Sequence, residues 1–364
     1  MAKPPLWGLR VGRSLRTARR RNQETLPTGS VLAPSRLWFP EGVRAFILRN
    51  VAIALIVGAS AGVVSGEIIT KEQSKINDDR ASRERALASE QAKQATRLEN
   101  LRFIRSFSSS AQLDRPFSSI DLHGEPLMGL KLANARLDNA DLGSADLSDI
   151  DLGGAKMASV NLNSSQLLRA NLRGAELLNA NMENADLSVA HAESADLYGA
   201  KMAGARMHET HLEGARLERA DLRHVKAVLK SKYGGFRTMI VYLMDAHLGS
   251  SDMTHADLTE ARLDRADLYE ANLTDAVLEY ANLQNANLSR ALIKGTNLTN
   301  ANLSGADLTR ADLTGANLTG ANLTGTNLAG ANLLESQLGN IFYDSNTSWP
   351  DNFHPPQSRA SLVG

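Results

Sequence analysis

The histidines near the middle of the chain are the side chains whose type and spacing best suit chemistry. His191 and His211 lie twenty residues apart, and His208 lies close to them in the sequence. Two or three imidazoles that meet in space could bind a metal ion, but such a site needs supporting partners that orient the rings. The sequence identifies none. Exposed histidines are therefore the favoured interpretation, and we expect no bound metal and no cofactor.

The rest of the sequence contains no catalytic constellation. A Walker loop, a G-x-S-x-G turn, an H-E-x-x-H motif and a dinucleotide-binding glycine motif are all absent. The lack of cysteine excludes disulfides, thiolate metal sites and cysteine nucleophiles. The many carboxylates recur at regular positions, as expected of a solvated surface. We therefore expect a protein that is not an enzyme and has no small-molecule substrate.

A five-residue repeat runs through most of the chain. Stepping by five from Leu122 to Leu222, and again from Leu248 to Leu338, visits 40 positions, of which 33 are Leu and five are Met. Two residues before these positions, Ala occurs in 29 cases, and Asp or Asn often stands between. A period of five fits neither a helix nor a flat strand. It fits a chain that turns a corner once in every five residues.

Four such corners close a square coil of about twenty residues, in which Leu and the preceding Ala point inward. Stacked coils can pair backbone to backbone at the strand spacing of about 4.8 Å. We therefore predict an all-β solenoid of about ten coils over residues 119–340. Because an end coil leaves its apolar face open, the stack needs caps. We expect residues 341–364, which are rich in aromatic side chains, to form a C-terminal cap and tail; a loose tail is the alternative.

The run A-[DN]-L-x-x resembles the pentapeptide repeat family, and the resemblance covers about 220 residues. It implies a right-handed quadrilateral β-helix. The flanks, residues 97–105, 115–117 and 348–356, are similar to those of actinobacterial membrane-anchored pentapeptide proteins. That second resemblance implies a membrane anchor before the solenoid.

The repeat is interrupted once, over residues 223–242. An irregular loop on a rigid scaffold is a common place for function, so this insertion is a candidate partner-binding loop. A tolerated insertion that merely joins two halves of the solenoid is the alternative. The candidate loop residues are basic or aromatic: Lys226, Lys230, Lys232, Tyr233, Phe236 and Arg237.

The N-terminal third has three expected parts. Residues 1–44 are rich in Arg and indicate a flexible basic tail, with a transit peptide as the alternative. Residues 45–69 contain an apolar stretch of about the length that crosses a bilayer, so we predict a single transmembrane helix, with a buried helix as the alternative. Residues 70–110 consist of strong helix formers and predict a helical stalk.

Three glycines spaced by four residues, Gly58, Gly62 and Gly66, lie on one face of the expected membrane helix. Small residues at this spacing let two membrane helices approach closely, which indicates a homodimer, although such patterns often occur without dimerisation. Basic residues just after the helix favour a single-pass membrane protein with a cytoplasmic solenoid, whereas the wider basic tail favours the opposite orientation.

The formal net charge is zero, but charge is segregated along the chain: residues 1–118 carry +10, residues 119–222 carry −7 and residues 248–340 carry −6. We therefore predict a membrane-anchored scaffold that binds an unknown protein partner through the solenoid faces. The alternative, which the family resemblance implies, is a DNA mimic that binds DNA gyrase. Direct nucleic-acid binding is disfavoured because the acidic body would repel phosphate.

Overall fold

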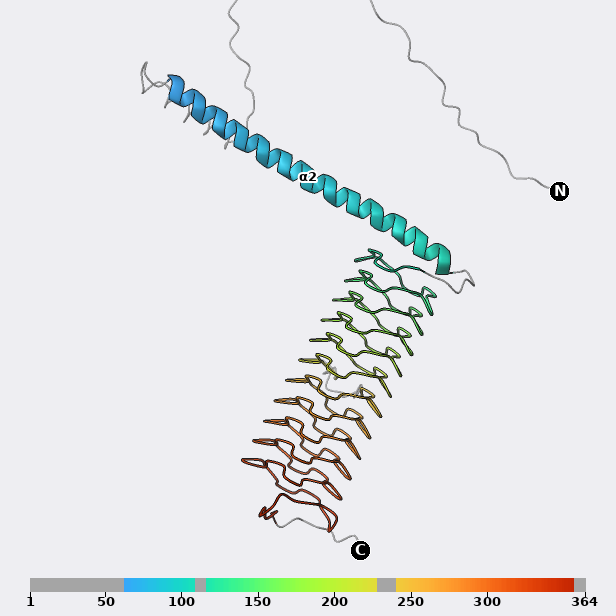
Figure 1. Ribbon diagram of the computed structural model, residues 1–364, viewed down its shortest axis with the longest axis vertical. Coiled ribbons are helices and arrows are strands. Elements are labelled where there is room, and N and C mark those ends of the chain that lie inside the picture. The colour runs from blue at the N-terminus through green and yellow to red at the C-terminus, as the bar shows by residue number, and fades with distance from the viewer. Residues whose placement is uncertain (1–61, 109–115, 228–239, 357–364) are drawn as a thin grey trace, which may run out of the picture. The chain divides into compact units, whose positions relative to one another are not determined.

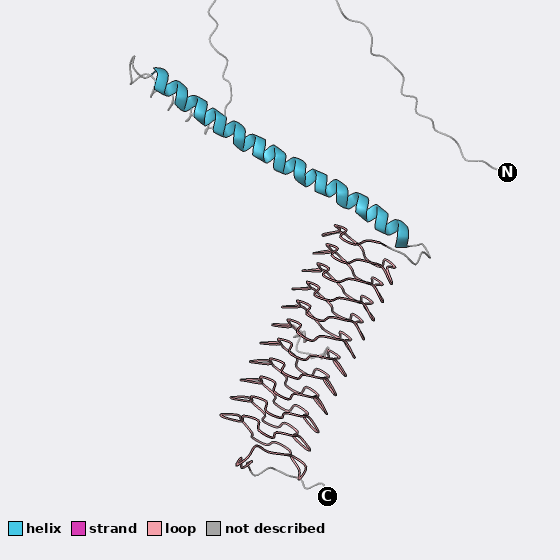
Figure 2. Ribbon diagram, viewed as in Figure 1, coloured by secondary structure: helices cyan, strands magenta, loops and turns pink. Residues whose placement is uncertain are grey.

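The computed structural model describes residues 62–108, 116–227 and 240–356. The chain divides into two compact units, Met1–Ala81 and Ser82–Gly364. Each five-residue repeat appears as turns and isolated parallel pairings rather than as long strands (Figure 2).

One helix, α2, spans Gly62–Ser108 and is 47 residues long (Figure 1). Its composition explains the helix, because Ala, Glu, Lys, Arg and Gln dominate it and no glycine or proline follows Gly66. Nearly all side chains from Lys71 to Thr96 are exposed. Over this length α2 is a polar helix without a buried face.

The polarity of α2 bears on the predicted membrane anchor. Within the described residues, no helix combines the length and the apolar character needed to cross a bilayer. This finding contradicts the predicted single-pass membrane localisation. Residues 45–61 of the predicted transmembrane segment, with Gly58, lie outside the described residues.

The solenoid begins at Pro116. Every pairing that does not cross the interruption joins residues twenty or twenty-one positions apart, from Pro116↔Arg136 to Asn327↔Ser348. Four repeats therefore make one coil. Each of the four columns of paired residues, one for each side of the coil, has at least eleven members among the described residues. The residue that pairs is the one just before the Leu, the position where Asp and Asn dominate.

Hydrogen bonding explains why Asp and Asn dominate the paired position. In residues 140–144, four of the five N–H groups donate to backbone carbonyl oxygens at 2.8–3.0 Å. The remaining N–H, that of Gly143, donates to Asp141 Oδ1 at 3.0 Å. Later coils repeat this bond with asparagine, as in Ser304 N–H to Asn302 Oδ1 at 3.2 Å. The Asp or Asn side chain thus satisfies the N–H that the backbone leaves without a partner.

Each corner is a tight turn closed by a backbone hydrogen bond, such as Ala140 N–H to Leu137 O at 3.0 Å. The third residue of the turn has a positive φ, 59° at Asn139, as a type II turn requires. Gly, Asn and Ser fill many of these positions, but Val189 also adopts a φ of 60°.

Leu and Ala fill the interior, and the axial leucines from Leu122 to Leu328 are at most 3% exposed. Leu333 and Leu338, in the last coil, are only partly buried. The core is therefore one continuous apolar column, as the five-residue spacing predicts.

The interruption of the repeat is shorter than residues 223–242. Lys226 pairs with Arg206 and Asp257 as a regular coil residue, and Tyr242 pairs with His211 and Arg262. His211 and Tyr242 are 31 residues apart instead of the usual twenty. Eleven extra residues therefore lie between Ala227 and Val241.

The C-terminal part of α2 packs on the first coil. Ile104 is fully buried, and Phe103 and Phe107 make edge contacts with Phe117 at ring-centroid distances of 5.7 Å. Arg97 Nε lies 3.1 Å from an Asp121 carboxylate oxygen. This end of α2 thus covers apolar surface that the first coil would otherwise expose.

The last coil carries the aromatic residues of the C-terminal segment. Phe342 continues a column of paired residues and is 46% exposed. The Trp349 ring contacts Tyr343 and Phe353, each at a centroid distance of 5.3 Å. Tyr343 and Trp349 also pack against the core.

Candidate functional site

One column of paired residues, here named the histidine column, departs from the Asp and Asn pattern in four successive coils beside the interruption; another column departs over the first four coils, at Pro116, Arg136, Lys156 and Glu176. The departing residues of the histidine column are His191, His211, Tyr242 and Arg262. Tyr242 follows the interruption, so the departure lies beside the point where the regular coils resume. From the first coil to the last, the histidine column consists of Lys131, Asp151, Asn171, His191, His211, Tyr242, Arg262, Asn282, Asn302, Asn322 and Phe342.

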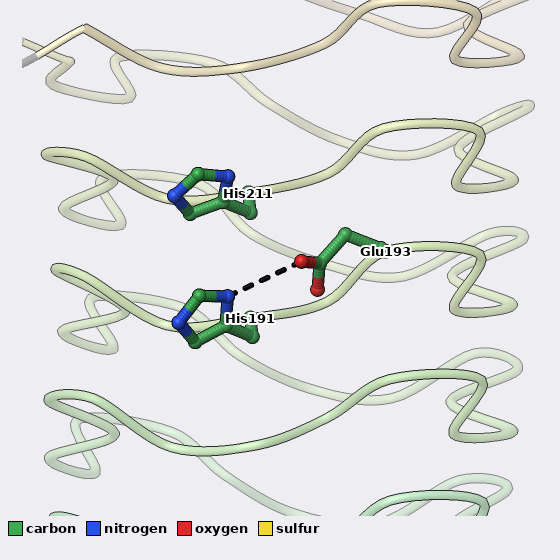
Figure 3. A group of neighbouring side chains, drawn as sticks. All are labelled: His191, Glu193 and His211. Atoms are coloured by element: carbon green, nitrogen blue, oxygen red, sulfur yellow. Dashed lines mark hydrogen bonds and ion pairs between the residues drawn. The ribbon is translucent and has the colours of Figure 1, made fainter.

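Three rings of the histidine column stack along the solenoid. His191 and His211 lie at a centroid distance of 4.8 Å with an interplanar angle of 14° (Figure 3). His211 and Tyr242 lie 4.5 Å apart at 3°. Parallel pairing of adjacent coils sets this spacing, because equivalent residues repeat at the strand separation. The interruption brings Tyr242 into register with His211.

A carboxylate stands beside each imidazole. Glu193 Oε1 lies 3.2 Å from His191 Nδ1, and Glu213 Oε1 lies 3.0 Å from His211 Nδ1. Each glutamate follows its histidine by two residues, so both side chains leave the same side of the extended chain. In Figure 3 the Glu193 carboxylate reaches toward the Nδ1 edge of the His191 ring.

Arg173 completes the N-terminal side of the cluster. Its Nη2 and Nε atoms donate to the two Glu193 carboxylate oxygens at 2.8 and 3.1 Å, and Nη2 also lies 3.0 Å from His191 Nδ1. The hydrogen bonds with Glu193 raise the pKa of Arg173 above its ordinary value. Partial burial would raise the pKa of Glu193, but hydrogen bonds from Arg173, its own backbone N–H and His191 together lower it.

The carboxylate of Glu213 has fewer hydrogen-bond and ion-pair partners than that of Glu193 among the described residues. Its Oε2 atom is buried and has no hydrogen-bond partner in the described part of the chain. Glu218 has a similar buried Oε2 atom, but Arg216 lies 3.7 Å from its other oxygen. His211 is the ion-pair partner recorded for Glu213 among the described residues.

Beyond Tyr242 the column continues as a charged network. Arg262 lies 3.3 Å from Asp264, a carboxylate that also accepts from Asn282 Nδ2 at 3.1 Å. Arg265 bridges Asp264 and Asp245. This network links adjacent coils on the same side of the solenoid.

The structure supplies the supporting carboxylates that the sequence analysis did not identify. Ligand atoms of His191, Glu193 and His211 all lie within 4.8 Å of one another, so these residues could hold a metal ion. The pattern H-x-E occurs at 191–193 and again at 211–213, and this repetition was the available sequence signal. His208 does not join this group: it is 2% exposed, and its Nδ1 has no hydrogen-bond partner in the described coils.

The predicted partner-binding loop is largely outside the described residues. Lys226 is exposed and occupies a regular coil position. The other five, Lys230, Lys232, Tyr233, Phe236 and Arg237, fall within 228–239 and lie outside the described residues. Gly62 and Gly66 lie in α2, and homodimerisation through them stays a prediction.

Comparisons with known proteins identify the repeat. The pentapeptide repeat family profile matches eight copies, which fall within residues 129–188, 193–226 and 242–341. These segments together cover more than half of the chain. No curated protein matches the chain significantly.

Several similar solved structures are described as pentapeptide repeat proteins. HetL, a pentapeptide repeat protein involved in heterocyst differentiation regulation from the cyanobacterium Nostoc sp. strain PCC 7120, is 30% identical. The match covers 66% of this chain and 95% of HetL, with a TM-score of 0.25. The pentapeptide repeat protein alr5209 from Nostoc PCC 7120 is 42% identical over 26% of this chain and 77% of its own, with a TM-score of 0.25. QnrB1, a plasmid-mediated fluoroquinolone resistance protein, is 17% identical over 66% of this chain and 92% of its own, with a TM-score of 0.22.

The fold thus defines a repeat protein built from four-sided coils. The chain belongs to the pentapeptide repeat family. This membership confirms the predicted right-handed quadrilateral β-helix.

Proposed function

We propose that this protein is a non-enzymatic scaffold that binds a protein partner through the side of the solenoid that carries the histidine column. The observation that supports this proposal is the replacement of Asp and Asn by His191, His211, Tyr242 and Arg262 in four successive coils beside the interruption. The family supplies the coarse expectation, since pentapeptide repeat proteins commonly bind protein partners.

These replacements do not serve the coil in the way that Asp and Asn do. An Asp or Asn at the paired position accepts a hydrogen bond from the backbone N–H two residues later, as Asn282 does from Gln284 at 3.3 Å. The imidazoles of His191 and His211 instead place Nδ1 against Glu193 and Glu213, and the Arg262 side chain contacts Asp264 and is 45% exposed. Tyr242 is half-buried in the same column. Tyr and Arg are among the residue types that most often dominate the energy of protein interfaces.

The surface charge argues against the DNA-mimic alternative. A mimic of duplex DNA would need continuous rows of uncompensated acids. Here arginines from adjacent coils interrupt the rows of acids: Arg169 pairs with Asp149 at 2.7 Å, and Arg265 pairs with Asp245 at 2.6 Å. Four more such pairs join residues twenty apart: Arg173 with Glu193, Arg206 with Asp186, Arg216 with Asp196, and Arg290 with Glu270.

Site-specific photo-crosslinking in the native cell tests the proposal. One full-length variant carries the crosslinking residue in place of Arg262, and a control carries it in place of Lys201, an exposed residue in the column on the opposite side of the solenoid. We expect a discrete crosslinked protein from position 262, none from position 201, and loss of that product when Tyr242→Asn is added. Equal products from both positions, no product from either, or a product that survives Tyr242→Asn would contradict this assignment.

A further inference from the structure

Protein binding does not explain why two histidines of the histidine column each have a glutamate carboxylate beside Nδ1. We propose that His191, Glu193, His211 and Glu213 bind one divalent transition-metal ion, with zinc as the best match. Two imidazoles and two carboxylates are a donor set that suits zinc in tetrahedral coordination. This inference does not rest on the proposed partner binding and is tested on the purified chain alone.

The distances bring three of the four donors close together. The donor atoms of His191, Glu193 and His211 lie within 4.8 Å of one another, and His191 Nδ1 is already 3.2 Å from Glu193 Oε1. At zinc bond lengths of about 2.0–2.2 Å, tetrahedral ligand atoms lie roughly 3.3–3.6 Å apart. Because the two rings are stacked nearly parallel, both imidazoles must rotate before their Nδ1 lone pairs can converge on one ion. The His191 and His211 side chains, 37% and 30% exposed, have room to rotate.

Glu213 provides an independent reason for a cation. Its Oε2 atom is buried without a hydrogen-bond partner among the described residues, which is costly for an ionised carboxylate. Glu193 and Glu213 occupy the same position in adjacent coils, and Arg173 pairs with Glu193. With both imidazoles neutral, two carboxylates and one guanidinium leave a net negative charge. A metal ion at the Nδ1 edges of the two stacked rings, where the carboxylates lie, would offset this charge.

His191 provides a second reason. Its Nδ1 atom lies between a donor, Arg173 Nη2 at 3.0 Å, and an acceptor, Glu193 Oε1 at 3.2 Å. One ring nitrogen cannot both accept from Arg173 and donate to Glu193. A metal ion in place of the guanidinium would take the Nδ1 lone pair and a Glu193 oxygen together. Arg173 is therefore the competitor of the metal, and its side chain, 56% exposed, can turn into solvent.

The chain contains a matched control. His224 and His255 also stack in adjacent coils, at a centroid distance of 5.2 Å and an angle of 13°. Among the described residues, the carboxylate that forms an ion pair with this pair is Asp275, at 3.9 Å from His255 Nδ1, which is beyond hydrogen-bond distance. Stacking of histidines alone thus occurs without the paired carboxylates that distinguish the proposed site.

Calorimetric zinc titration of the full-length protein, stripped with a chelator, tests the site. We expect one zinc ion per chain with a micromolar dissociation constant, and weakening of at least about tenfold in a His191→Asn, His211→Asn double variant. Asparagine already occupies the same column at Asn171 and Asn282, so this variant keeps the coil. Arg173→Gln should tighten zinc binding several-fold because it removes the competing guanidinium.

The His224→Asn, His255→Asn variant should bind zinc as the wild type does. Zinc should also raise the Tm of the wild type and of this control, but not that of the His191/His211 variant. No zinc uptake by the wild type, equal affinity in the His191/His211 variant, or weaker binding after Arg173→Gln would overturn the proposal.

Discussion

At the residue scale, each turn contains one residue with positive φ, and the type of that residue determines the conformational free energy that the turn requires. Most residue types meet steric resistance in the left-handed region, and a β-branched side chain meets the most. Val189 nevertheless adopts a φ of 60°, whereas Asn184, at the equivalent position of the preceding repeat, has a residue type that tolerates its φ of 57°. Valine at position 189 is therefore an unfavourable residue type for the backbone conformation of this turn.

Replacing Val189 with Asn should stabilise the solenoid by about 1 kcal/mol, because asparagine adopts the left-handed conformation at lower cost. Urea denaturation measures this difference. The reverse change in the neighbouring turn, Asn184→Val, should destabilise by a similar amount. If both variants shift stability in the same direction, the turn conformation is not the cause.

The residue scale also shows what the sequence could predict about the site. His191 and His211 were found from their spacing, which matches one coil. Their carboxylate partners were missed, although residues i and i+2 share a side of an extended chain and both glutamates are visible in the sequence. Tyr242 could not be assigned to the same column, because counting by fives across the interruption does not reveal that eleven residues are extra.

At the element scale, α2 combines two environments. Its side chains are exposed over most of its length, yet Leu101 and Ile104 near its C-terminal end are buried with the solenoid core. Helix-forming composition alone predicts the exposed part. The run of hydrophobic residues in the last turns is too short to predict that these turns pack on the first coil. The predicted single-pass membrane localisation is contradicted, because α2 is polar from Gly62 onward and no helix in the described residues is long and apolar enough to cross a bilayer.

Ile104→Ala should destabilise the first coil by roughly 2–5 kcal/mol, since it leaves a cavity where α2 meets that coil. Hydrogen exchange checks this locally: the Leu122 N–H, which donates to Asp141 O at 2.8 Å, should lose protection before amides of later coils do. Leu98→Ala in the same helix is the matched control. Leu98 is 53% exposed, so its replacement should change stability by no more than about 0.5 kcal/mol. Equal effects of the two changes would show that Ile104 does not hold the coil.

At the scale of the whole molecule, ion pairs between adjacent coils make stability depend on pH. The hydrogen bond from Arg169 holds the pKa of Asp149 below its usual value, and Arg265 does the same for Asp245. A carboxyl whose pKa is lower in the folded protein stabilises the fold above its ordinary pKa of about 3.9 and loses that contribution as the pH falls further.

We therefore expect the contribution of these pairs to Tm to stay level between about pH 5 and 7 and to decline below about pH 4. Thermal denaturation followed by circular dichroism across this range measures the profile. An Asp149→Asn, Asp245→Asn double variant should show a shallower decline, because its amides do not titrate. An identical decline in both proteins would mean that these two pairs are not responsible.

The five-residue period could be predicted from the sequence because each repeat obeys the same local rules: a buried Leu, a small Ala and an Asp or Asn that satisfies one N–H. The number of residues that leave the coil at the interruption could not be predicted from the sequence. Val225 and Ala227 still occupy inward positions, although they are not the Ala and Leu of the pattern. Local rules therefore fix the coil, and pairing between coils fixes where it resumes.

The packing of α2 on the first coil gives the solenoid a direction of growth during synthesis. The covering helix leaves the ribosome before any coil, so the first twenty residues of the solenoid meet a surface that is already made. Each later coil then adds to a completed one, and at about 5–20 residues per second this takes on the order of one to four seconds. A nascent chain of any length consequently exposes only one unfinished edge, and that edge is the same size after the second coil as after the tenth.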